Sequence, residues 1–186
     1  MNARQILRRR GAVAAVTSVL VAGGIAGCTS GHRITASTTV TTARSDGPSD
    51  AAHIVCTDTA RNEITGALGI DTTKPLAPTW SDHTYSCRYV FTDGSLLLSV
   101  KDLPDAAATT AWFDSLRTAA GSTPLSGMGD GAIQQPDGNV VVRKDDAVLV
   151  VDVTALPASV GKPVRPRAVA ARTVAQTVMI CWKEYG

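Results

Sequence analysis

The sequence is poor in aromatic residues and in histidine, and it lacks the motifs of several enzyme classes. Phe, Trp and Tyr together make up 4% of the 186 residues, and there are three histidines. His53 and His83 have no glutamate at zinc-peptidase spacing, and the sequence contains no Gly-x-Ser-x-Gly motif. These absences exclude the zinc peptidases and serine hydrolases that such motifs define.

Basic residues are also too few for a nucleic-acid surface. Four of the 18 Lys and Arg residues lie within residues 1–10, which leaves 14 against 16 acidic residues in the rest of the chain. Proteins that bind nucleic acid usually concentrate basic residues on one face of the fold. We therefore expect no nucleic-acid partner.

Two patterns resemble ligand-binding motifs but lack the surroundings that those motifs need. Gly127-x-Gly129-x-x-Ala132 has the spacing of a dinucleotide-binding loop, which requires a strand before it and a helix after it. Because Pro124 and Pro136 flank it, we predict a tight loop that enters a strand. Four aspartates do not fit a calcium-binding loop and are predicted to be turn residues: Asp130, Asp137, Asp145 and Asp146. The sequence thus predicts neither a cofactor nor a metal site.

The start of the chain has the pattern of a lipoprotein signal peptide. A cluster of arginines in residues 1–10 precedes an apolar run over residues 11–24, and the run is followed by Ile25-Ala26-Gly27-Cys28. A basic segment, a short apolar segment and small residues before a cleavage site are typical of secretory signals. A hydrophobic residue, two small residues and a cysteine match a lipobox, so residues 1–27 are predicted to be removed and Cys28 lipidated. Acyl chains would then anchor the protein at the outer face of the cell membrane.

Other interpretations of this segment remain open. An ordinary signal peptidase could cleave here with Cys28 as an incidental cysteine, or the apolar run could stay as an uncleaved anchor. The run is shorter than the roughly 20 apolar residues that span a bilayer. The arginine pairs in residues 8–10 fit twin-arginine export, but Gly11 and Ala12 match that signal poorly, so general secretion is equally open.

Residues 28–50 are predicted to tether the lipidated cysteine to a folded domain. They are rich in Thr and Ser and contain almost no large apolar side chain. Such a segment cannot bury enough surface to offset its ordering entropy, and it is either a plain linker or an O-glycosylated one. We therefore expect a single extracytoplasmic domain over residues 51–186.

Within this domain, helical and strand patterns alternate. Apolar residues recur at helical spacing over residues 57–68, 105–120 and 167–183. Strands are predicted over residues 84–91, 95–103, 131–134, 139–143 and 147–154, with Asp93-Gly94 as a hairpin turn. The order αββα(β)ββα predicts an α+β fold: an antiparallel sheet of four to five strands, with about three helices packed on one face.

The three tryptophans occupy different predicted environments. Trp112 falls on the apolar stripe of the second helix with Ala108 and Leu116, and Trp182 lies near the end of the last helix. Trp80 lies in a proline-bounded segment, residues 71–81, that is predicted to be a loop. Core or loop packing is the more typical role for all three, but Trp80 is also a candidate ligand contact.

Three cysteines remain besides Cys28. An exported protein meets an oxidising environment, so one disulfide is expected, and three pairings are possible. Cys56 precedes the first helix and Cys87 lies in the first strand, so a bridge between them closes a loop of about 30 residues. We favour this pair, with Cys181 on the apolar stripe of the last helix as a buried thiol.

A set of short motifs resembles one group of bacterial lipoproteins. Cys56 leads a helix that ends in Leu68-Gly69, then Cys87-Arg88-Tyr89 follows, and the last helix ends in Cys181-Trp182. Over about residues 52–184 this resembles actinobacterial lipoproteins with a Cys–helix–Leu-Gly…Cys-Arg-Trp/Tyr pattern, which are loosely similar to the extracellular sensor-type domains of mycobacterial Ser/Thr kinases. The resemblance implies a binding or sensor domain at the envelope and carries over no catalytic residues.

Two classes of function follow from these patterns. The one we favour is a membrane-anchored, non-catalytic binding or accessory lipoprotein that acts on an envelope ligand or a membrane-protein partner. The alternative is a cell-envelope enzyme with a site that no motif reveals. A deep pocket with convergent ionisable groups would favour the enzyme, whereas an apolar groove or an exposed aromatic patch would favour binding.

Overall fold

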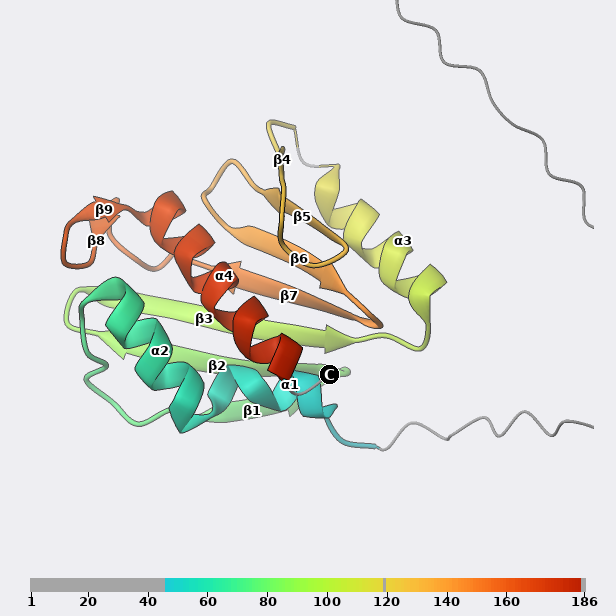
Figure 1. The fold of residues 1–186 in the computed structure, drawn as a ribbon, viewed down its shortest axis with the longest axis horizontal. Helices are drawn as coiled ribbons and strands as arrows, with labels where there is room; N and C mark the ends of the chain where they lie inside the picture. Colours follow the sequence, from blue (N-terminus) through green and yellow to red (C-terminus); the bar gives the residue numbers. More distant parts are fainter. Residues whose placement is uncertain (1–45, 119, 185–186) are drawn as a thin grey trace, which may run out of the picture. The chain divides into compact units, whose positions relative to one another are not determined.

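The computed structural model describes residues 46–118 and 120–184, which fold around a seven-stranded antiparallel sheet. The strands are β1 Pro78–Ser81, β2 Thr84–Phe91, β3 Gly94–Asp102, β4 Thr123–Leu125, β5 Gly131–Gln134, β6 Val140–Lys144 and β7 Ala147–Asp152. Their order is β1-β2-β3-β7-β6-β5-β4, so two meanders meet at the β3–β7 pair (Figure 1). The expected signal segment, Cys28 and the greater part of the expected tether lie outside the described residues.

The α+β class and the antiparallel sheet are confirmed, but the sheet is larger than the four to five strands predicted. The two additional strands, β1 and β4, form its edges and contain Pro78 and Pro124. Proline lacks a backbone N–H group and is tolerated on edge strands, where one side of the backbone has no neighbour. Because of these prolines, the sequence predicts loops for both segments.

In this part of the chain the helices lie on both faces of the sheet, not on one as predicted. They are α1 Asp50–His53, a 3-10 turn η1 Ile54–Cys56, α2 Asp58–Leu68, α3 Ala106–Arg117 and α4 Arg167–Glu184. The first three and α4 contribute to one large hydrophobic cluster, whereas α3 packs into a separate, smaller one. The second cluster exists because β6 and β7 bury valines on both faces: Val140, Val142 and Val151 on one, Val141 and Val148 on the other.

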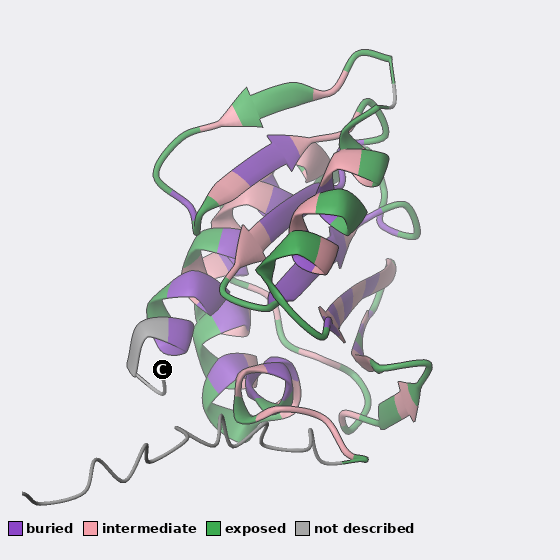
Figure 2. Ribbon diagram, turned by 90° about the vertical axis from the view of Figure 1, so that its right-hand side faces the viewer, coloured by how far each residue is buried: buried purple, intermediate pink, exposed green. Residues whose placement is uncertain are grey.

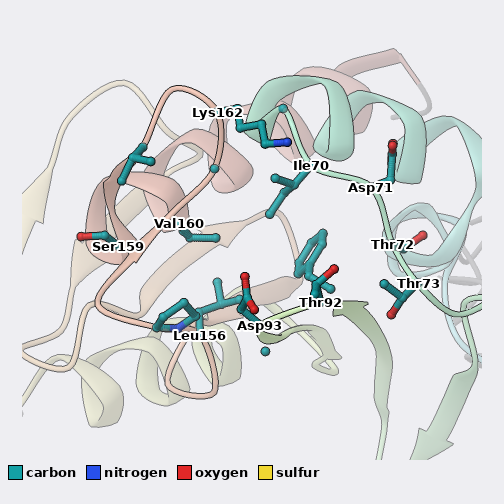
Figure 3. Close-up of a pocket in the computed structure, with 16 residues that line it drawn as sticks. Ile70, Asp71, Thr72, Thr73, Thr92, Asp93, Leu156, Ser159, Val160 and Lys162 are labelled. Atoms are coloured by element: carbon teal, nitrogen blue, oxygen red, sulfur yellow. The ribbon is translucent and has the colours of Figure 1, made fainter.

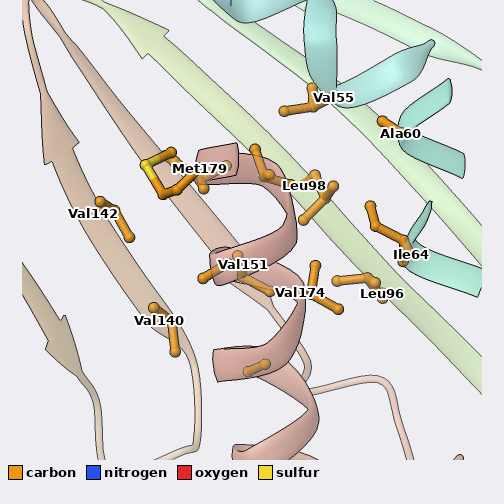
Figure 4. Close-up of a cluster of buried hydrophobic side chains, with 14 of the residues drawn as sticks. Val55, Ala60, Ile64, Leu96, Leu98, Val140, Val142, Val151, Val174 and Met179 are labelled. Carbon is orange, nitrogen blue, oxygen red and sulfur yellow. The ribbon is translucent and has the colours of Figure 1, made fainter. Parts of the chain in front are cut away.

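The larger cluster lies between α4 and the central strands. Figure 4 shows Val174 and Met179 of α4 among the side chains of the strands and of α2. The stripe predicted for this helix is confirmed, because each of its members is buried: Ala170, Val174, Val178 and Cys181. Buried residues gather where helices and strands face one another, and the outward helix faces are exposed (Figure 2).

The stripe predicted for α3 is displaced by one residue. Thr109 and Phe113 are buried, whereas Trp112 is 39% exposed. The helix also ends at Arg117 instead of continuing to Gly121. Helical spacing could not choose between Trp112 and Phe113, because the choice depends on which side of the helix the sheet covers.

Side-chain caps begin two of the helices. The Thr57 hydroxyl accepts a 3.1 Å hydrogen bond from the Ala60 N–H group at the start of α2, and Gly69 ends this helix in the left-handed conformation. The Asp105 carboxylate accepts a 2.8 Å bond from the Ala108 N–H group at the start of α3. Both caps satisfy backbone donors that the first turn of a helix leaves unpaired.

The favoured disulfide is confirmed, because Cys56 is bonded to Cys87 with their Cα atoms 5.4 Å apart. Beside it, the Tyr89 hydroxyl donates a 2.8 Å hydrogen bond to the Val55 carbonyl, and burial raises the pKa of this phenol. The disulfide and this hydrogen bond together fasten η1 to β2. Cys181 is 7% exposed and lies in the core.

The chain enters the domain beside the end of β3. The Ser49 hydroxyl caps α1 and donates a 2.7 Å hydrogen bond to the buried carboxylate of Asp102. A second bond of 2.8 Å runs from the Ser49 N–H group to the same carboxylate. In the described residues, no helix is both long and apolar enough to cross a bilayer.

Candidate functional site

A cleft of about 530 Å³ opens at the end of the sheet formed by the β2–β3 turn. Three segments line it: residues 69–73 after α2, residues 91–94 at the turn, and residues 156–164 before α4 (Figure 3). The third segment and the residues after it contain a small hairpin of β8 Ser159–Val160 and β9 Arg165–Pro166. We call this space the hairpin cleft.

The hairpin cleft has an apolar floor and a polar rim. Phe91, Leu156 and Val160 are 6%, 4% and 8% exposed, and Ile70 is half-buried beside them. Figure 3 shows Thr92 and Asp93 at the turn, with Asp93 beside Leu156. The remaining rim groups are hydroxyls and charged side chains: Asp71, Thr72, Thr73, Ser159 and Lys162.

Backbone contacts hold the walls of the cleft together. The Lys162 N–H group donates a 2.8 Å hydrogen bond to the Leu68 carbonyl at the end of α2. On the other side, the Thr73 N–H group donates 2.7 Å to the Val90 carbonyl of β2. Residues 69–73 are therefore held at one end to the segment before α4 and at the other end to β2.

Three glycines make these close approaches possible. Gly69, Gly94 and Gly161 have φ values of +67°, +155° and +92°, which L side chains rarely adopt. A Cβ atom on Gly161 would lie 2.7 Å from the Leu68 carbonyl oxygen. Cβ atoms on Gly69 and Gly94 would clash with the carbonyl oxygens of Lys162 and Ala155. The cleft is thus shaped by backbone packing that tolerates no side chain at these positions.

The charged groups of the rim are available to a ligand. Within the described residues, Asp71, Asp93 and Lys162 take part in none of the ion pairs, and all three are exposed. Ligand pockets commonly enclose about 300–1,000 Å³, with mostly apolar walls and a few polar groups that fix orientation. The arrangement suits a ligand with an apolar body and with hydroxyl or charged groups at its ends.

A second hollow, of about 600 Å³, is less well equipped for recognition. It lies between the Gly127–Asp130 turn and α4, and it includes Met179 and Ile180, of which Ile180 is 64% exposed. Its lysine, Lys144, is engaged by Asp145 at 2.6 Å. The glycine-rich segment here is a turn that enters β5, as predicted for Gly127–Ala132.

Trp80 does not line the hairpin cleft. It lies in edge strand β1, opposite Tyr85 of β2, and is half-buried. Because β2 runs from Thr84 to Phe91, Trp80 and the cleft lie at opposite ends of that strand. The structure brings Trp80 next to His83, with ring centroids 6.0 Å apart.

Sequence patterns did not predict the hairpin cleft. Gly69 was recognised as a helix stop and Asp93-Gly94 as a turn, and both assignments concern only local structure. The meeting of these two sites with Gly161 depends on how the segment after β7 folds back, which no local pattern encodes. No group of three or more His, Cys, Asp or Glu side chains that could hold a metal ion occurs among the residues described. Comparisons with protein-family models, curated proteins and solved structures each gave no match to this chain.

Proposed function

We propose that this protein is an extracytoplasmic lipoprotein, anchored through Cys28 at the outer face of the cell membrane, whose domain binds a ligand in the hairpin cleft. The lipobox at residues 25–28 supports the anchor. The disulfide between Cys56 and Cys87 supports an oxidising compartment, because such bonds are rare where thiols are kept reduced. A sensor or accessory role at the envelope fits the resemblance to actinobacterial lipoproteins and kinase sensor domains.

The observation that carries the binding role is the construction of the hairpin cleft. Its apolar floor offers surface to bury, and its rim offers Asp71, Asp93 and Lys162 for orientation. Walls held by backbone contacts lose little entropy when a ligand binds, which favours affinity. The proposed ligand is a small molecule or a short peptide with an apolar body and polar ends.

Binding is favoured over catalysis by the way the rim groups are arranged. Covalent or acid–base catalysis needs a nucleophile and a base within hydrogen-bond reach of each other. Among the rim hydroxyls, that of Thr73 donates a 3.2 Å hydrogen bond to the Val90 carbonyl and not to a rim carboxylate. An envelope enzyme remains the alternative, and turnover of an envelope substrate abolished by Asp93→Asn in a folded protein would establish it.

Filling the cleft tests the binding role. Thr92 is exposed on the rim at the β2–β3 turn, so Thr92→Trp should occupy the cleft without disturbing the core. Native mass spectrometry after incubation with an envelope extract should detect a bound species, with affinity weakened by about tenfold or more in this variant, equivalent to at least about 1.4 kcal/mol.

The matched control is Ser126→Trp, an exposed turn position outside the hairpin cleft, which should bind as the wild-type protein does. Equal affinity of all three proteins would place the ligand elsewhere. Failure of the wild-type protein to retain any species would contradict the binding role.

A further inference from the structure

Aromatic and charged side chains lie at the end of the sheet opposite the hairpin cleft. Trp80 is on the face of the larger hydrophobic cluster, and Lys101 and Trp112 are on the face that α3 covers. The Trp80 and His83 rings meet edge to face, and Asp82 beside them pairs with Lys101 at 3.0 Å. The Lys101 ammonium group also lies 5.0 Å from the centre of the Trp112 ring. We call this set the aromatic patch: Trp80, Asp82, His83, Lys101 and Trp112.

The aromatic patch is notable in a chain with so few aromatic residues. Two of the three tryptophans belong to it, while the third, Trp182, is 2% exposed in the core. Trp112 is 39% exposed, and Trp80 is half-buried. Tyr85, the cross-strand partner of Trp80, adds a further ring, which lies 4.9 Å from that of His53.

The chain enters the domain at this patch. The Trp80 indole N–H group donates a 3.2 Å hydrogen bond to the backbone carbonyl of Asp46. Asp46 is the first described residue, and Cys28 lies 18 positions before it. A chain of that length spans at most about 60 Å, so an anchor at Cys28 keeps the patch within reach of the bilayer surface.

We propose that the aromatic patch lies on the lipid headgroups and turns the hairpin cleft away from the membrane. This inference rests on the proposed anchor at Cys28. Tryptophan concentrates at membrane interfaces, because its ring is apolar and its N–H group is polar.

The charges of the aromatic patch indicate whether anionic lipid headgroups would attract it. Lys101 is balanced by Asp82, and the Lys101 hydrogen bond lowers the pKa of the Asp82 carboxyl. The patch therefore carries no excess of positive charge for anionic lipids to attract. Contact is made through the indole rings and does not depend on anionic headgroups.

Fluorescence quenching by brominated lipid tests this orientation. The mature chain, which begins at Cys28, is coupled through the Cys28 thiol to a maleimide lipid in phosphatidylcholine vesicles whose acyl chains are brominated next to the headgroup. Compared with unbrominated vesicles, the wild-type protein should lose the emission of Trp80 and Trp112, two of its three tryptophans, and retain that of buried Trp182.

A matched variant adds a fluorescent side chain at the cleft end of the domain and leaves the aromatic patch intact. Val164 is 74% exposed and lines the hairpin cleft, so the tryptophan added by Val164→Trp should keep its emission in brominated vesicles and the quenched fraction of the total emission should fall. Equal quenching of this variant and the wild-type protein would show random orientation and overturn the proposal. An unquenched wild-type protein would also overturn it and would leave the patch for a protein partner.

Coupling at Cys28 keeps this test separate from the proposed function. The chemical anchor holds the domain at the vesicle whether or not cells acylate Cys28. Absence of natural acylation would therefore contradict the proposed function alone, and absence of quenching would contradict the orientation alone.

Discussion

Replacing Cys56 and Cys87 together by alanine is expected to lower the free energy of unfolding by about 3–4 kcal/mol. The bridge spans 31 residues of sequence, and a closed loop of that length restricts the unfolded chain strongly. It also fastens η1 to β2 next to the hydrogen bond from Tyr89 to Val55. Loss of the bridge therefore raises the conformational entropy of the unfolded chain, and it also weakens the contact between η1 and β2 in the folded protein.

Urea denaturation measures this change, and thermal unfolding should show a midpoint lower by roughly 10 °C for a domain of this size. Treating the wild-type protein with a reductant should produce a similar loss, which separates the effect of the bond from that of the side chains. A change below about 1 kcal/mol in both experiments would mean that the disulfide does little to stabilise the fold.

Gly69→Ala is expected to cost about 2–4 kcal/mol of folding stability and to distort the hairpin cleft. Gly69 has a φ of +67°, and its Cβ would meet the Lys162 carbonyl oxygen. The substitution therefore combines a strained backbone with a collision between two walls of the cleft. Because the walls must separate, ligand binding in the cleft should weaken as well.

Gly66→Ala, one turn earlier in α2, provides the matched control. A Cβ atom on Gly66 meets nothing within 4 Å, and alanine in a helix interior is favoured over glycine. This variant should gain about 0.5–1 kcal/mol in urea denaturation, with ligand binding unchanged. If both substitutions had the same small effect, the close approach of Gly69 to Lys162 would not be holding the cleft.

Much of the fold could be predicted because its signals are local. Thr57 and Gly69 mark the two ends of α2, and alternation of Tyr85, Cys87 and Tyr89 marks the buried face of β2. These patterns depend only on a residue and its near neighbours in sequence. The strands and helices that they define match the structure closely.

The errors have a common physical origin in tertiary packing. The prolines of β1 and β4 hide two strands whose pairing depends on their position at the sheet edge. Phe113 is buried instead of Trp112, because α3 covers the second face of the sheet. Neither the pairing of the edge strands nor the burial of Phe113 can be predicted from a few neighbouring residues in the sequence.

The candidate site shows the same limit. The residues that form the hairpin cleft come from three segments more than 90 positions apart at the extremes, Gly69 and Val164. Trp80 was considered as a ligand contact on its own, whereas its surroundings only become apparent when β1, β3 and α3 are brought together. The glycines at 69, 94 and 161 could be predicted as turn positions, but their close approaches to Lys162, Ala155 and Leu68 could not.

We propose that Cys28 anchors the domain at the membrane. Intact mass spectrometry of the protein from the membrane fraction tests it most directly, with Cys28→Ala as the comparison. The account predicts that residues 1–27 are absent and that acyl chains add mass at Cys28, and that Cys28→Ala abolishes processing or releases the domain from the membrane. An unacylated mature protein, or the same acylated product from the Cys28→Ala variant, would contradict it.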